Sequence, residues 1–414
     1  MTDRAGTAGR VVVVGAGHAG GTFAALLCQA GFSGEVVVFG DELDPPYHRP
    51  PLSKEFLSGP LEKWLREPAF YAEQGVALRL GERVVQIDRA AATVTSENGR
   101  TWSYDHLVLA TGAASRWLDV PGADLDGVGM LRSLVDARVL RDRVRAAGSV
   151  AVVGGGYIGL EVAAAVRGNG TPATVIERED RILARVASAE LSAILARFHS
   201  ERGTAVMTDS VVRRFDGEAG RLRAVVVTGP DGDERHVPCD VAVVGVGAVP
   251  RDKLARSARL TCDNGIVVDD GARTDDPRIL AIGDVTSRPV RGVTGRMRLE
   301  SIPSAVEQAR QAVATVLGGP AVEPEVPWFW SDQFDLKLKI AGVLRGTFAT
   351  VVRGDPGAGR FALFHHREGV LVAVETANAP ADFMAGRRLL TAGRPVDPGR
   401  LADQRIGLRD LVTV

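Results

Sequence analysis

The sequence predicts an α/β fold built from two similar βαβ domains and a C-terminal α+β domain. Two observations favour it. Residues 11–40 and 150–177 both run from an apolar strand through a glycine-rich turn into an alanine-rich helix and a second apolar strand. Beyond residue 320 the pattern changes to alternating strands such as "RFALFHH" and "GVLVAVET".

Composition limits the kind of protein that this can be. The 414 residues, 45% of them hydrophobic, suffice for the cores of two or three domains. The formal net charge of −1 gives no global attraction to nucleic acid or to a membrane surface. No apolar run is long enough to span a bilayer, and the opening "MTDRAGTAGR" reads as a loose tail without a signal peptide. We expect a soluble cytoplasmic protein with no nucleic-acid or membrane partner.

Each repeated segment contains a G-x-G-x-x-G turn directly after a four-residue apolar run. The first glycine allows a tight turn, the second lets the backbone approach a pyrophosphate, and the third lets the helix pack closely on the strand. The unpaired N–H groups of the helix N-terminus then face the phosphates. Two such turns in full βαβ context predict two Rossmann-like dinucleotide-binding domains. This plan resembles that of glutathione reductase. The glycines are Gly15, Gly17 and Gly20 in the first unit and Gly154, Gly156 and Gly159 in the second.

The two units differ where the second strand ends. In the second unit this strand closes on Glu177. A carboxylate there can accept hydrogen bonds from the ribose hydroxyls and repels a 2′-phosphate, so we expect NADH to be preferred over NADPH. In the first unit the matching residue is Gly40, followed by Asp41. The ribose contact is there either displaced or made by Asp41.

A later strand, in "RILAIGDVTS", ends on Gly283 and Asp284. Parallel sheets bind ligands at the carboxyl ends of their strands, so Asp284 is placed to receive a ribityl hydroxyl; taken alone, it could equally be a turn aspartate. A helix follows, with Ser301 or Ser304 as its N-cap and Ser304 with Glu307 as a capping box. Its positive end would face the ligand beside Asp284 and would stabilise a reduced flavin.

Several further segments indicate a family. The specific ones are "RPPLSK" and "PWFWSDQ"; they accompany "VVVVGAGHAG", "LVLATGA", "VAVVGGGYIGLEVAA", "ILAIGDV" and "RLESIPSAVEQA". Over nearly its whole length the chain resembles the FAD-dependent, NADH-using ferredoxin reductases of bacterial cytochrome P450 and Rieske dioxygenase systems, the putidaredoxin reductase group. The resemblance implies an FAD-binding domain at 1–112 and 245–320, an NADH-binding domain at 113–244, and a C-terminal domain at 321–414 that helps to cover the flavin.

The resemblance also gives a role to the stretch "PPYHRPPLSK". It implies that Lys54 lies close to the isoalloxazine ring with Glu161 within reach as its partner, and these two are the predicted catalytic residues. The prolines reduce the entropy that is lost when the segment becomes ordered. The ammonium group would compensate the negative charge of a reduced flavin. The alternative is a solvated lysine after an extended proline turn.

The other site residues follow from the resemblance position by position. The residues expected at FAD are Gly15, Gly17, His18, Ala19, Gly20, Asp41, Arg49, Lys54, Val84, Thr111, Gly112, Arg132, Gly283, Asp284, Ser301, Ile302 and Trp330. Those expected at NADH are Gly154, Gly156, Tyr157, Ile158, Gly159, Glu161, Glu177, Arg185 and Gly247. The alternatives are a core aromatic for Trp330 and a surface arginine for Arg185.

The three cysteines, Cys28, Cys239 and Cys262, have neither C-x-x-C nor metal-ligand spacing. We expect ordinary thiols and no metal site. The redox cysteine pair of disulfide reductases is therefore missing. The segment "YHRPPLSK" also lacks the single cysteine that NADH oxidases and peroxidases of this architecture carry there. Without a thiol to receive them, electrons from the flavin must pass to an external acceptor.

The resemblance implies NADH:ferredoxin oxidoreduction, in which hydride passes from NADH to FAD and single electrons pass on to an iron–sulfur protein. The expected partner is a ferredoxin, and the expected state is a monomer or weak dimer. The alternatives are an apoptosis-inducing-factor-like flavoprotein, which acts largely through interactions, and a rubredoxin reductase. Because ferredoxins are usually acidic, we expect a basic docking face. The candidates are Arg288, Arg291, Arg296, Arg298, Lys337 and Lys339, with solvated surface as the alternative.

Overall fold

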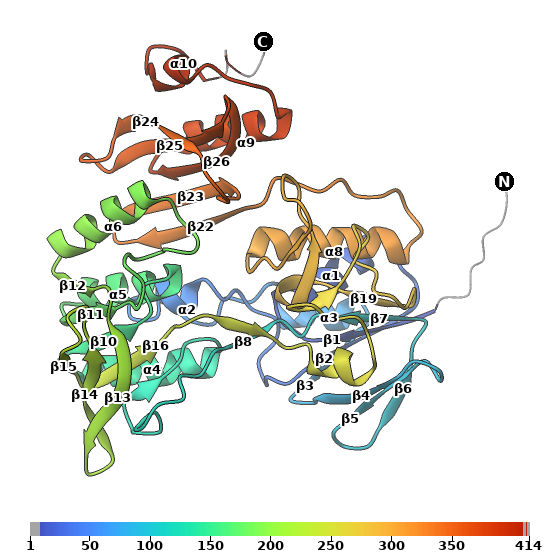
Figure 1. Ribbon diagram of the computed structural model, residues 1–414. Coiled ribbons are helices and arrows are strands. Elements are labelled where there is room, and N and C mark those ends of the chain that lie inside the picture. The colour runs from blue at the N-terminus through green and yellow to red at the C-terminus, as the bar shows by residue number, and fades with distance from the viewer. Residues whose placement is uncertain (1–8, 409–410, 412–414) are drawn as a thin grey trace. The chain divides into compact units, whose positions relative to one another are not determined.

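A computed structural model describes residues 9–408 and residue 411 (Figure 1). Residues 1–8, most of the predicted N-terminal tail, lie outside the described residues. Internal contacts divide the chain into two compact units. Unit 1 comprises residues 9–48, 62–114 and 249–327, and unit 2 comprises residues 49–61, 115–248 and 328–408 with 411. The predicted domain boundaries, after residues 112, 244 and 320, stay predictions.

Unit 1 contains a five-stranded parallel sheet in the order β19-β7-β1-β2-β3. Its strands are β1 (Arg10–Val14), β2 (Glu35–Gly40), β3 (Val76–Leu80), β7 (His106–Leu109) and β19 (Ile279–Ala281). Alternate valines of β1 enter two separate cores: Val11 and Val13 lie with helices α1 (His18–Gln29) and α8 (Ile302–Val316), and Val12 and Val14 face the opposite layer. A strand that is covered on both faces requires an unbroken apolar run, which "VVVV" supplies.

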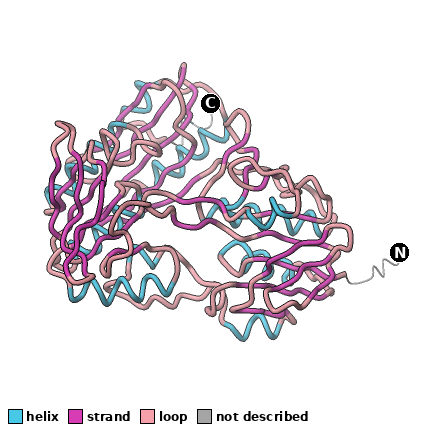
Figure 2. Tube along the Cα trace, turned by 60° about the horizontal axis from the view of Figure 1, so that its bottom comes forward, coloured by secondary structure: helices cyan, strands magenta, loops and turns pink. Residues whose placement is uncertain are grey.

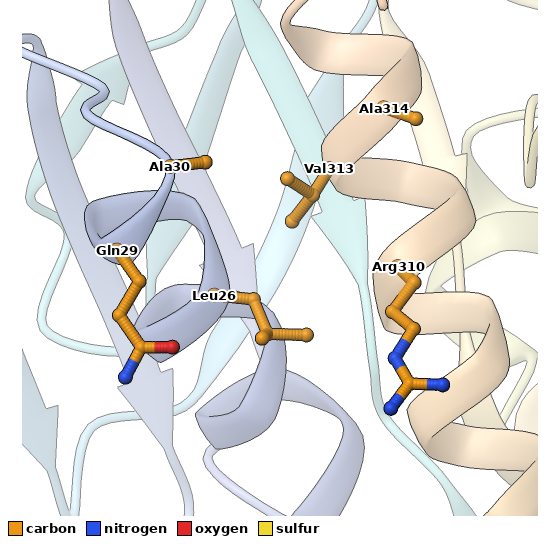
Figure 3. A pocket seen from close by; sticks show the side chains of 6 residues that line it. All are labelled: Leu26, Gln29, Ala30, Arg310, Val313 and Ala314. Carbon is orange, nitrogen blue, oxygen red and sulfur yellow. The ribbon is translucent and has the colours of Figure 1, made fainter. Parts of the chain in front are cut away.

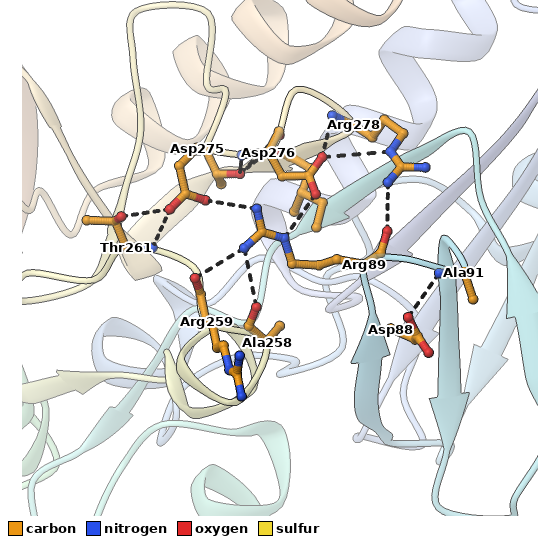
Figure 4. Close-up of polar contacts among 11 residues, drawn as sticks. Asp88, Arg89, Ala91, Ala258, Arg259, Thr261, Asp275, Asp276 and Arg278 are labelled. Carbon is orange, nitrogen blue, oxygen red and sulfur yellow. Dashed lines mark hydrogen bonds and ion pairs between the residues drawn. The ribbon is translucent and has the colours of Figure 1, made fainter.

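The second layer of unit 1 contains an antiparallel sheet, β4-β5-β6. Arg89, just after β4, donates its Nε to Asp276 over 3.0 Å and an Nη to the Arg259 carbonyl over 3.2 Å (Figure 4). Arg278 donates back to the Arg89 carbonyl over 2.6 Å. These bonds fasten the sheet to the segment that leads into β19. The small elements of unit 1 are α3 (Pro68–Glu73), β4 (Val84–Asp88), β5 (Thr93–Ser96), β6 (Thr101–Ser103), α7 (Lys253–Ser257), β18 (Ile266–Val267), η1 (Gly283–Val285), β20 (Thr286–Pro289) and β21 (Arg296–Met297).

Unit 2 repeats the parallel arrangement in the order β12-β11-β10-β16-β9. The strands are β9 (Val128–Gly129), β10 (Val150–Val153), β11 (Ala173–Ile176), β12 (Thr204–Met207) and β16 (Val241–Val244). The helices are α2 (Pro51–Lys54), α4 (Leu134–Ala146), α5 (Tyr157–Gly168) and α6 (Ala189–Glu201). An antiparallel sheet is formed by β13 (Val211–Glu218), β14 (Arg221–Thr228) and β15 (Glu234–Pro238). Two short paired strands, β8 (Ala113–Ser115) and β17 (Ala248–Pro250), each contain residues of both units.

The C-terminal part of unit 2 is an antiparallel sheet in the order β22-β23-β26-β25-β24. It comprises β22 (Trp328–Gln333), β23 (Leu336–Gly342), β24 (Ala349–Asp355), β25 (Arg360–Arg367) and β26 (Val370–Ala377), and is followed by α9 (Pro380–Ala392) and α10 (Pro398–Ala402). Figure 2 shows the helices and strands of the fold along the Cα trace. The predicted α/β class, with two dinucleotide-binding units and a C-terminal α+β part, is confirmed.

The start of helix α8 corrects one detail of the sequence prediction. Ser301 is the N-cap, and its side chain accepts a hydrogen bond from the Ser304 N–H. The alternative capping box of Ser304 and Glu307 is wrong. Glu307 instead pairs with Arg288 over 2.7 Å, and each side chain is only 5% exposed. No helix among the residues that the structure describes is long and apolar enough to cross a membrane.

Candidate active site

The first glycine turn, between β1 and α1, leaves no room for side chains. Gly15 has φ +119°, and a Cβ added there would lie 2.1 Å from the Ala110 carbonyl oxygen. A Cβ on Gly20 would lie 2.0 Å from the Gly15 oxygen. Both distances are below van der Waals contact, so only glycine lets β1, β7 and α1 approach this closely.

The second turn, between β10 and α5, repeats this geometry. Gly154 has φ +110°, and its added Cβ would lie 2.4 Å from the Gly245 oxygen, while that of Gly159 would lie 2.1 Å from the Gly154 oxygen. A Cβ on Gly156 would meet no heavy atom within 4 Å. The middle glycine therefore faces open space, as expected where backbone must come against a ligand.

Both turns lie where the strand order of their sheet reverses. β1 pairs with β2 on one side and β7 on the other, and β10 pairs with β11 and β16. The helices after the turns have glycine N-caps, Gly17 and Gly156, without a side-chain cap. The first N–H groups of these helices therefore have no side-chain cap and are placed to donate to a ligand outside the helix. The arrangement fits a pyrophosphate at each turn.

Glu177 lies beside the second turn in a fixed orientation. Its Oε2 accepts a hydrogen bond from the Gly155 N–H over 2.7 Å, and its Oε1 accepts one from the Glu179 N–H over 3.0 Å. Neighbouring Arg178 is 71% exposed and pairs with Glu179. The carboxylate is thus held by backbone amides and retains free lone pairs for a ligand's hydroxyl groups.

Near the first turn, an arginine joins three predicted residues. Arg251 donates to Asp41 over 2.8 Å, its carbonyl oxygen accepts from the Thr111 hydroxyl over 2.8 Å, and its N–H donates to the Gly112 oxygen over 2.9 Å. Sequence reasoning missed Arg251. The sequence feature that could have identified Arg251 as a site residue is its position directly after the strand in "VAVVGVGAVPR".

Asp284 is also brought to the first turn. It lies in η1, which starts at Gly283 with φ +80°, and a Cβ on Gly283 would lie 2.9 Å from the Cβ of Ala19 in α1. The hydroxyl of Thr286 donates to the Gly283 oxygen over 2.9 Å. Ser301 and Ile302 form the start of α8, which packs on both α1 and η1. Three segments that are far apart in sequence therefore converge at one sheet edge.

Two histidines lie in the same region of unit 1. The rings of His18, the first residue of α1, and His48 are 5.4 Å apart. Burial lowers the pKa of His48, and the charges of Arg66 and Lys63 act in the same direction. His48 is therefore a neutral imidazole over most of the physiological pH range.

In unit 2, Lys54 and Glu161 form an ion pair, as the resemblance implied. The lysine side chain is 12% exposed and the glutamate side chain 5% exposed. Ser53 donates to Glu161 Oε2 over 2.5 Å, and Ser331 donates to Oε1 over 2.6 Å. Lys54 is not a solvated surface lysine, because it ends the short helix α2 against α5. Arg49 donates to the Arg132 carbonyl, which brings these two predicted residues together as well.

The remaining predicted residues are more scattered. Val84 is buried in the core behind β1, and Trp330 is half-buried beside Trp328, with ring centroids 5.9 Å apart. The Tyr157 ring packs edge-on against Phe329 with ring centroids 4.9 Å apart, and burial raises the pKa of Tyr157. Ile158, by contrast, is 51% exposed at the start of α5. Their ligand contacts stay predictions, as do those of Arg185 and Gly247, which lie near each other.

The predicted docking arginines do not all reach the surface. Arg288 is buried and paired with Glu307, so its assignment to a docking face is wrong. Its sequence surroundings look hydrophilic, but the partner carboxylate lies 19 residues further on. Arg298 is only 13% exposed beside Glu300. Lys337 is 78% exposed, and Lys339 lies 5.6 Å from the centre of the Phe383 ring.

All three cysteines are free thiols, and the described residues contain no cluster of three or more potential metal ligands. Burial raises the pKa of Cys239 to about 12, so this thiol stays protonated at neutral pH. Burial also raises the pKa values of Cys28 and Cys262. A thiol without thiolate character is a poor nucleophile and a poor redox centre.

A shallow groove of unit 1 is separate from both glycine turns (Figure 3). It lies between the C-terminal end of α1 and helix α8, whereas the first turn adjoins the N-terminal end of α1. A 12-residue helix separates the two by about 18 Å. The lining is Leu26, Gln29, Ala30, Arg310, Val313 and Ala314, which offers no convergent polar set.

Comparison with known proteins places this geometry in a family. Residues 9–309 match the model described as pyridine nucleotide-disulphide oxidoreductase, and residues 328–412 match the one described as reductase C-terminal. The chain belongs to the pyridine nucleotide-disulphide oxidoreductase family. It is 47% identical to a probable ferredoxin reductase, CtmF, of Castellaniella defragrans, over 96% of this chain and 97% of the relative. It is 41% identical to rhodocoxin reductase of Rhodococcus erythropolis, over 96% of this chain and 93% of that one.

Solved structures of this oxidoreductase family agree closely. The ferredoxin reductase for the CYP199A2 system from Rhodopseudomonas palustris matches with a TM-score of 0.93 at 38% identity, covering 98% of this chain and 100% of that one. The covalent putidaredoxin reductase–putidaredoxin complex matches with a TM-score of 0.93 at 35% identity, covering 98% of each chain. The resemblance predicted from the sequence to ferredoxin reductases of the putidaredoxin reductase type is confirmed.

Proposed function

We propose that the protein is an FAD-dependent NADH:ferredoxin oxidoreductase that serves a cytochrome P450 or a Rieske oxygenase. The observation that carries the proposal is the pair of equivalent glycine turns together with the buried pair of Lys54 and Glu161. Relatives named as ferredoxin reductases support it. The two turns accept two dinucleotides, and the free, protonated cysteines leave an external protein as the electron acceptor.

The turn at Gly15 would hold the FAD pyrophosphate, with Asp41 and Asp284 on the ribose and ribityl hydroxyls. The turn at Gly156 would hold NADH, with Glu177 on the adenosine ribose. When bound, FAD supplies the chemistry that links a two-electron hydride donor to a one-electron acceptor. The chain itself provides binding and orientation, because transfer between two aligned rings requires no protein base.

Lys54 provides the fixed positive charge of the site. Its ammonium group is held by Glu161 and ends a helix that two prolines, Pro50 and Pro51, begin. A preorganised charge stabilises a developing negative charge without the cost of reorienting a free side chain. Glu161 would orient Lys54 and the approaching nicotinamide.

The proposed partner is an acidic ferredoxin, the proposed state a monomer or weak dimer, and the proposed location the cytoplasm, where free cysteines stay reduced. Of the docking candidates, exposed Lys337 is the best supported. Attraction between opposite charges would make ferredoxin reduction fall with salt, while reduction of a small acceptor such as ferricyanide would change little.

The test is anaerobic titration of the purified protein with NADH and with NADPH, followed by assays against a panel of ferredoxins. We expect a yellow protein with one FAD per chain, reduction by NADH, and rapid turnover with a ferredoxin. A colourless folded protein would overturn the proposal. Slow NADH oxidation with a long-lived charge-transfer complex and NADH-dependent dimerisation would instead favour the apoptosis-inducing-factor-like alternative.

A further inference from the structure

Glu161 is the end point of a longer buried chain of hydrogen bonds in unit 2. Ser331 donates to its Oε1, the Gln333 side chain lies 3.1 Å from the Ser331 hydroxyl, and His199 Nε2 lies 2.9 Å from Gln333 Oε1. Ser331, Gln333 and His199 are all 0% exposed. Ser331 and Gln333 share one face of β22, because side chains two apart on a strand point the same way. His199 comes from α6.

The charge on Glu161 fixes the direction of every bond in this chain. An ionised carboxylate accepts only, so the Ser331 hydroxyl must donate to it. Ser331 then accepts from Gln333, which must present its NH₂ group to the serine and its oxygen to His199. His199 must therefore donate through Nε2. Burial lowers the pKa of His199, so the ring is neutral and Nδ1 carries no proton.

The histidine is the residue that fixes the direction of the amide. Its Nδ1 has no hydrogen-bond partner within the part of the chain that the structure describes, so Nε2 makes its one polar contact there. Without the Nε2 donor, the Gln333 amide could turn over and offer its oxygen to Ser331. The serine proton would then turn toward the amide and away from Glu161. A neutral amide does not readily pass a proton on, so the chain orients groups and does not conduct protons.

We propose that Gln333 and His199, acting through Ser331, are positioning residues that hold the Glu161 carboxylate in place against Lys54. The inference rests on the proposed function, in which Lys54 lies beside the flavin. A carboxylate that is held by Ser53, Lys54 and Ser331 cannot rotate, and the lysine charge is fixed with it. The C-terminal sheet, which supplies Ser331 and Gln333, would thus influence the electrostatic potential at the flavin indirectly, through Glu161 of helix α5.

The test compares FAD-loaded variants by the midpoint potential of the flavin. His199→Phe keeps an aromatic ring next to Phe334, 5.2 Å from the present ring, but removes the donor. We expect it to change the ratio of oxidised to reduced flavin at fixed potential by about threefold to tenfold, the equivalent of one hydrogen bond. In a Glu161→Gln background the same substitution should cause no further change. His199→Gln, which restores an N–H donor, should recover the parent potential.

The matched control is Ser188→Ala. Ser188 is buried at the N-cap of the same helix, α6, but donates to Glu375, which belongs to a different network. It tests whether any disturbance of the helix alters the flavin, and we expect an unchanged potential. The proposal fails if His199→Phe shifts the potential equally in both backgrounds, if it has no effect in the parent, or if Ser188→Ala has the same effect.

A measurement that needs no variant and no turnover is ¹⁵N NMR of the histidine rings in the purified protein. We expect the ring of His199 to carry its proton on Nε2, with Nδ1 unprotonated, across pH 6 to 8. A proton on Nδ1 would overturn the direction of the chain even if every variant were unstable. Failure of the proposed function would be recognised separately, as absence of FAD or of ferredoxin reduction in the parent protein.

Discussion

Arg288 and Glu307 form a buried ion pair, with 2.7 Å between Nη2 and Oε2 and each side chain 5% exposed. Arg288 also donates to the Ser304 hydroxyl over 3.1 Å, and the other Glu307 oxygen accepts from the Glu325 N–H over 2.8 Å. The pair therefore joins β20, the first turns of α8 and the segment that leaves unit 1. A charge taken out of water this completely depends on its partner.

Removing one member of that pair is expected to be costly. Glu307→Ala should lower the free energy of unfolding by about 3–5 kcal/mol, because it leaves the Arg288 charge buried without a counterion. Glu325→Ala is the control, since its ion pair with Arg310 is about half exposed and should contribute at most about 1 kcal/mol. Chemical denaturation of both variants checks this. An equal decrease in the free energy of unfolding in Glu307→Ala and Glu325→Ala would contradict the argument that burial makes the Arg288–Glu307 pair costly to break.

The sequence predicts the elements better than the contacts between them. The glycine turns follow from local backbone geometry, which a six-residue motif specifies. The position of Arg288 does not, because "SRPVRGVTGRMR" has the composition of a solvated loop and nothing local indicates that Glu307 lies opposite. The same holds for Arg251 against Asp41, 210 residues apart.

The contact of Lys54 with Glu161 was available only through resemblance. The two residues are 107 positions apart, and no pattern in either segment specifies the other. The extension to Gln333 and His199 had no such guide. The segment "PWFWSDQ" is specific to a family, but the buried face of that strand is determined by tertiary packing, which periodicity alone does not predict.

The glycines at the two ends of helix α5, the N-cap Gly156 and the last residue Gly168, offer a test of the second turn. A Cβ on Gly156 or on Gly168 would meet no heavy atom within 4 Å, so the fold should accept alanine at both positions. Only Gly156 is proposed to face the NADH pyrophosphate. Gly156→Ala should raise the KM for NADH by about 10- to 100-fold at unchanged FAD content, because a displaced dinucleotide is poorly aligned. Gly168→Ala should behave as the parent in the same steady-state assay; a similar effect of both would refute the assignment.

Glu177 should determine the choice of nicotinamide cofactor. Its carboxylate is held by the N–H groups of Gly155 and Glu179 and would accept from the ribose hydroxyls. Glu177→Gln keeps the shape but loses the charge, so the ratio of kcat/KM for NADH to that for NADPH should fall by about tenfold. Glu179→Gln, in an exposed pair with Arg178, should leave the ratio unchanged. An unaltered ratio in Glu177→Gln would remove the residue from the cofactor site.

Asp276 should make unit 1 sensitive to acid. Burial opposes its charged form, but the Arg278 N–H and the Arg89 side chain outweigh this and lower the pKa of Asp276 below its usual 3.8. A lowered pKa in the folded state stabilises the fold above about pH 4, and this contribution is lost as the pH falls through the folded-state value. Asp276→Asn should therefore be less stable at pH 7 by about 1.5–3 kcal/mol and should lose less stability on acidification.

Denaturation of the parent and of Asp276→Asn between pH 2 and pH 7 measures both effects. Asp275→Asn is the control, because the Asp275 carboxylate is 39% exposed whereas that of Asp276 is 8% exposed. The control should cost less at pH 7. Parallel pH curves for the parent and Asp276→Asn would show that this carboxylate does not contribute to the acid sensitivity.

Arg353 should hold the C-terminal segment on its sheet. The guanidinium group, on β24, donates to the carbonyl oxygens of Leu401, Asp403, Gln404 and Ile406, and its Nε lies 3.4 Å from Asp382. Arg353→Ala leaves these carbonyls without their donor, so the segment should open more often. Trypsin should then cleave at exposed Arg400 and Arg405 at least about tenfold faster, since cleavage follows the population of the open form.

Two further variants serve as controls. Arg360→Ala, on the exposed end of the neighbouring strand, should not change the cleavage rate. Arg353→Lys should be cleaved at an intermediate rate, because a point charge cannot span four carbonyls. Equal cleavage rates in all four proteins would mean that the packing of Leu401 and Leu408, and not the arginine, retains the segment.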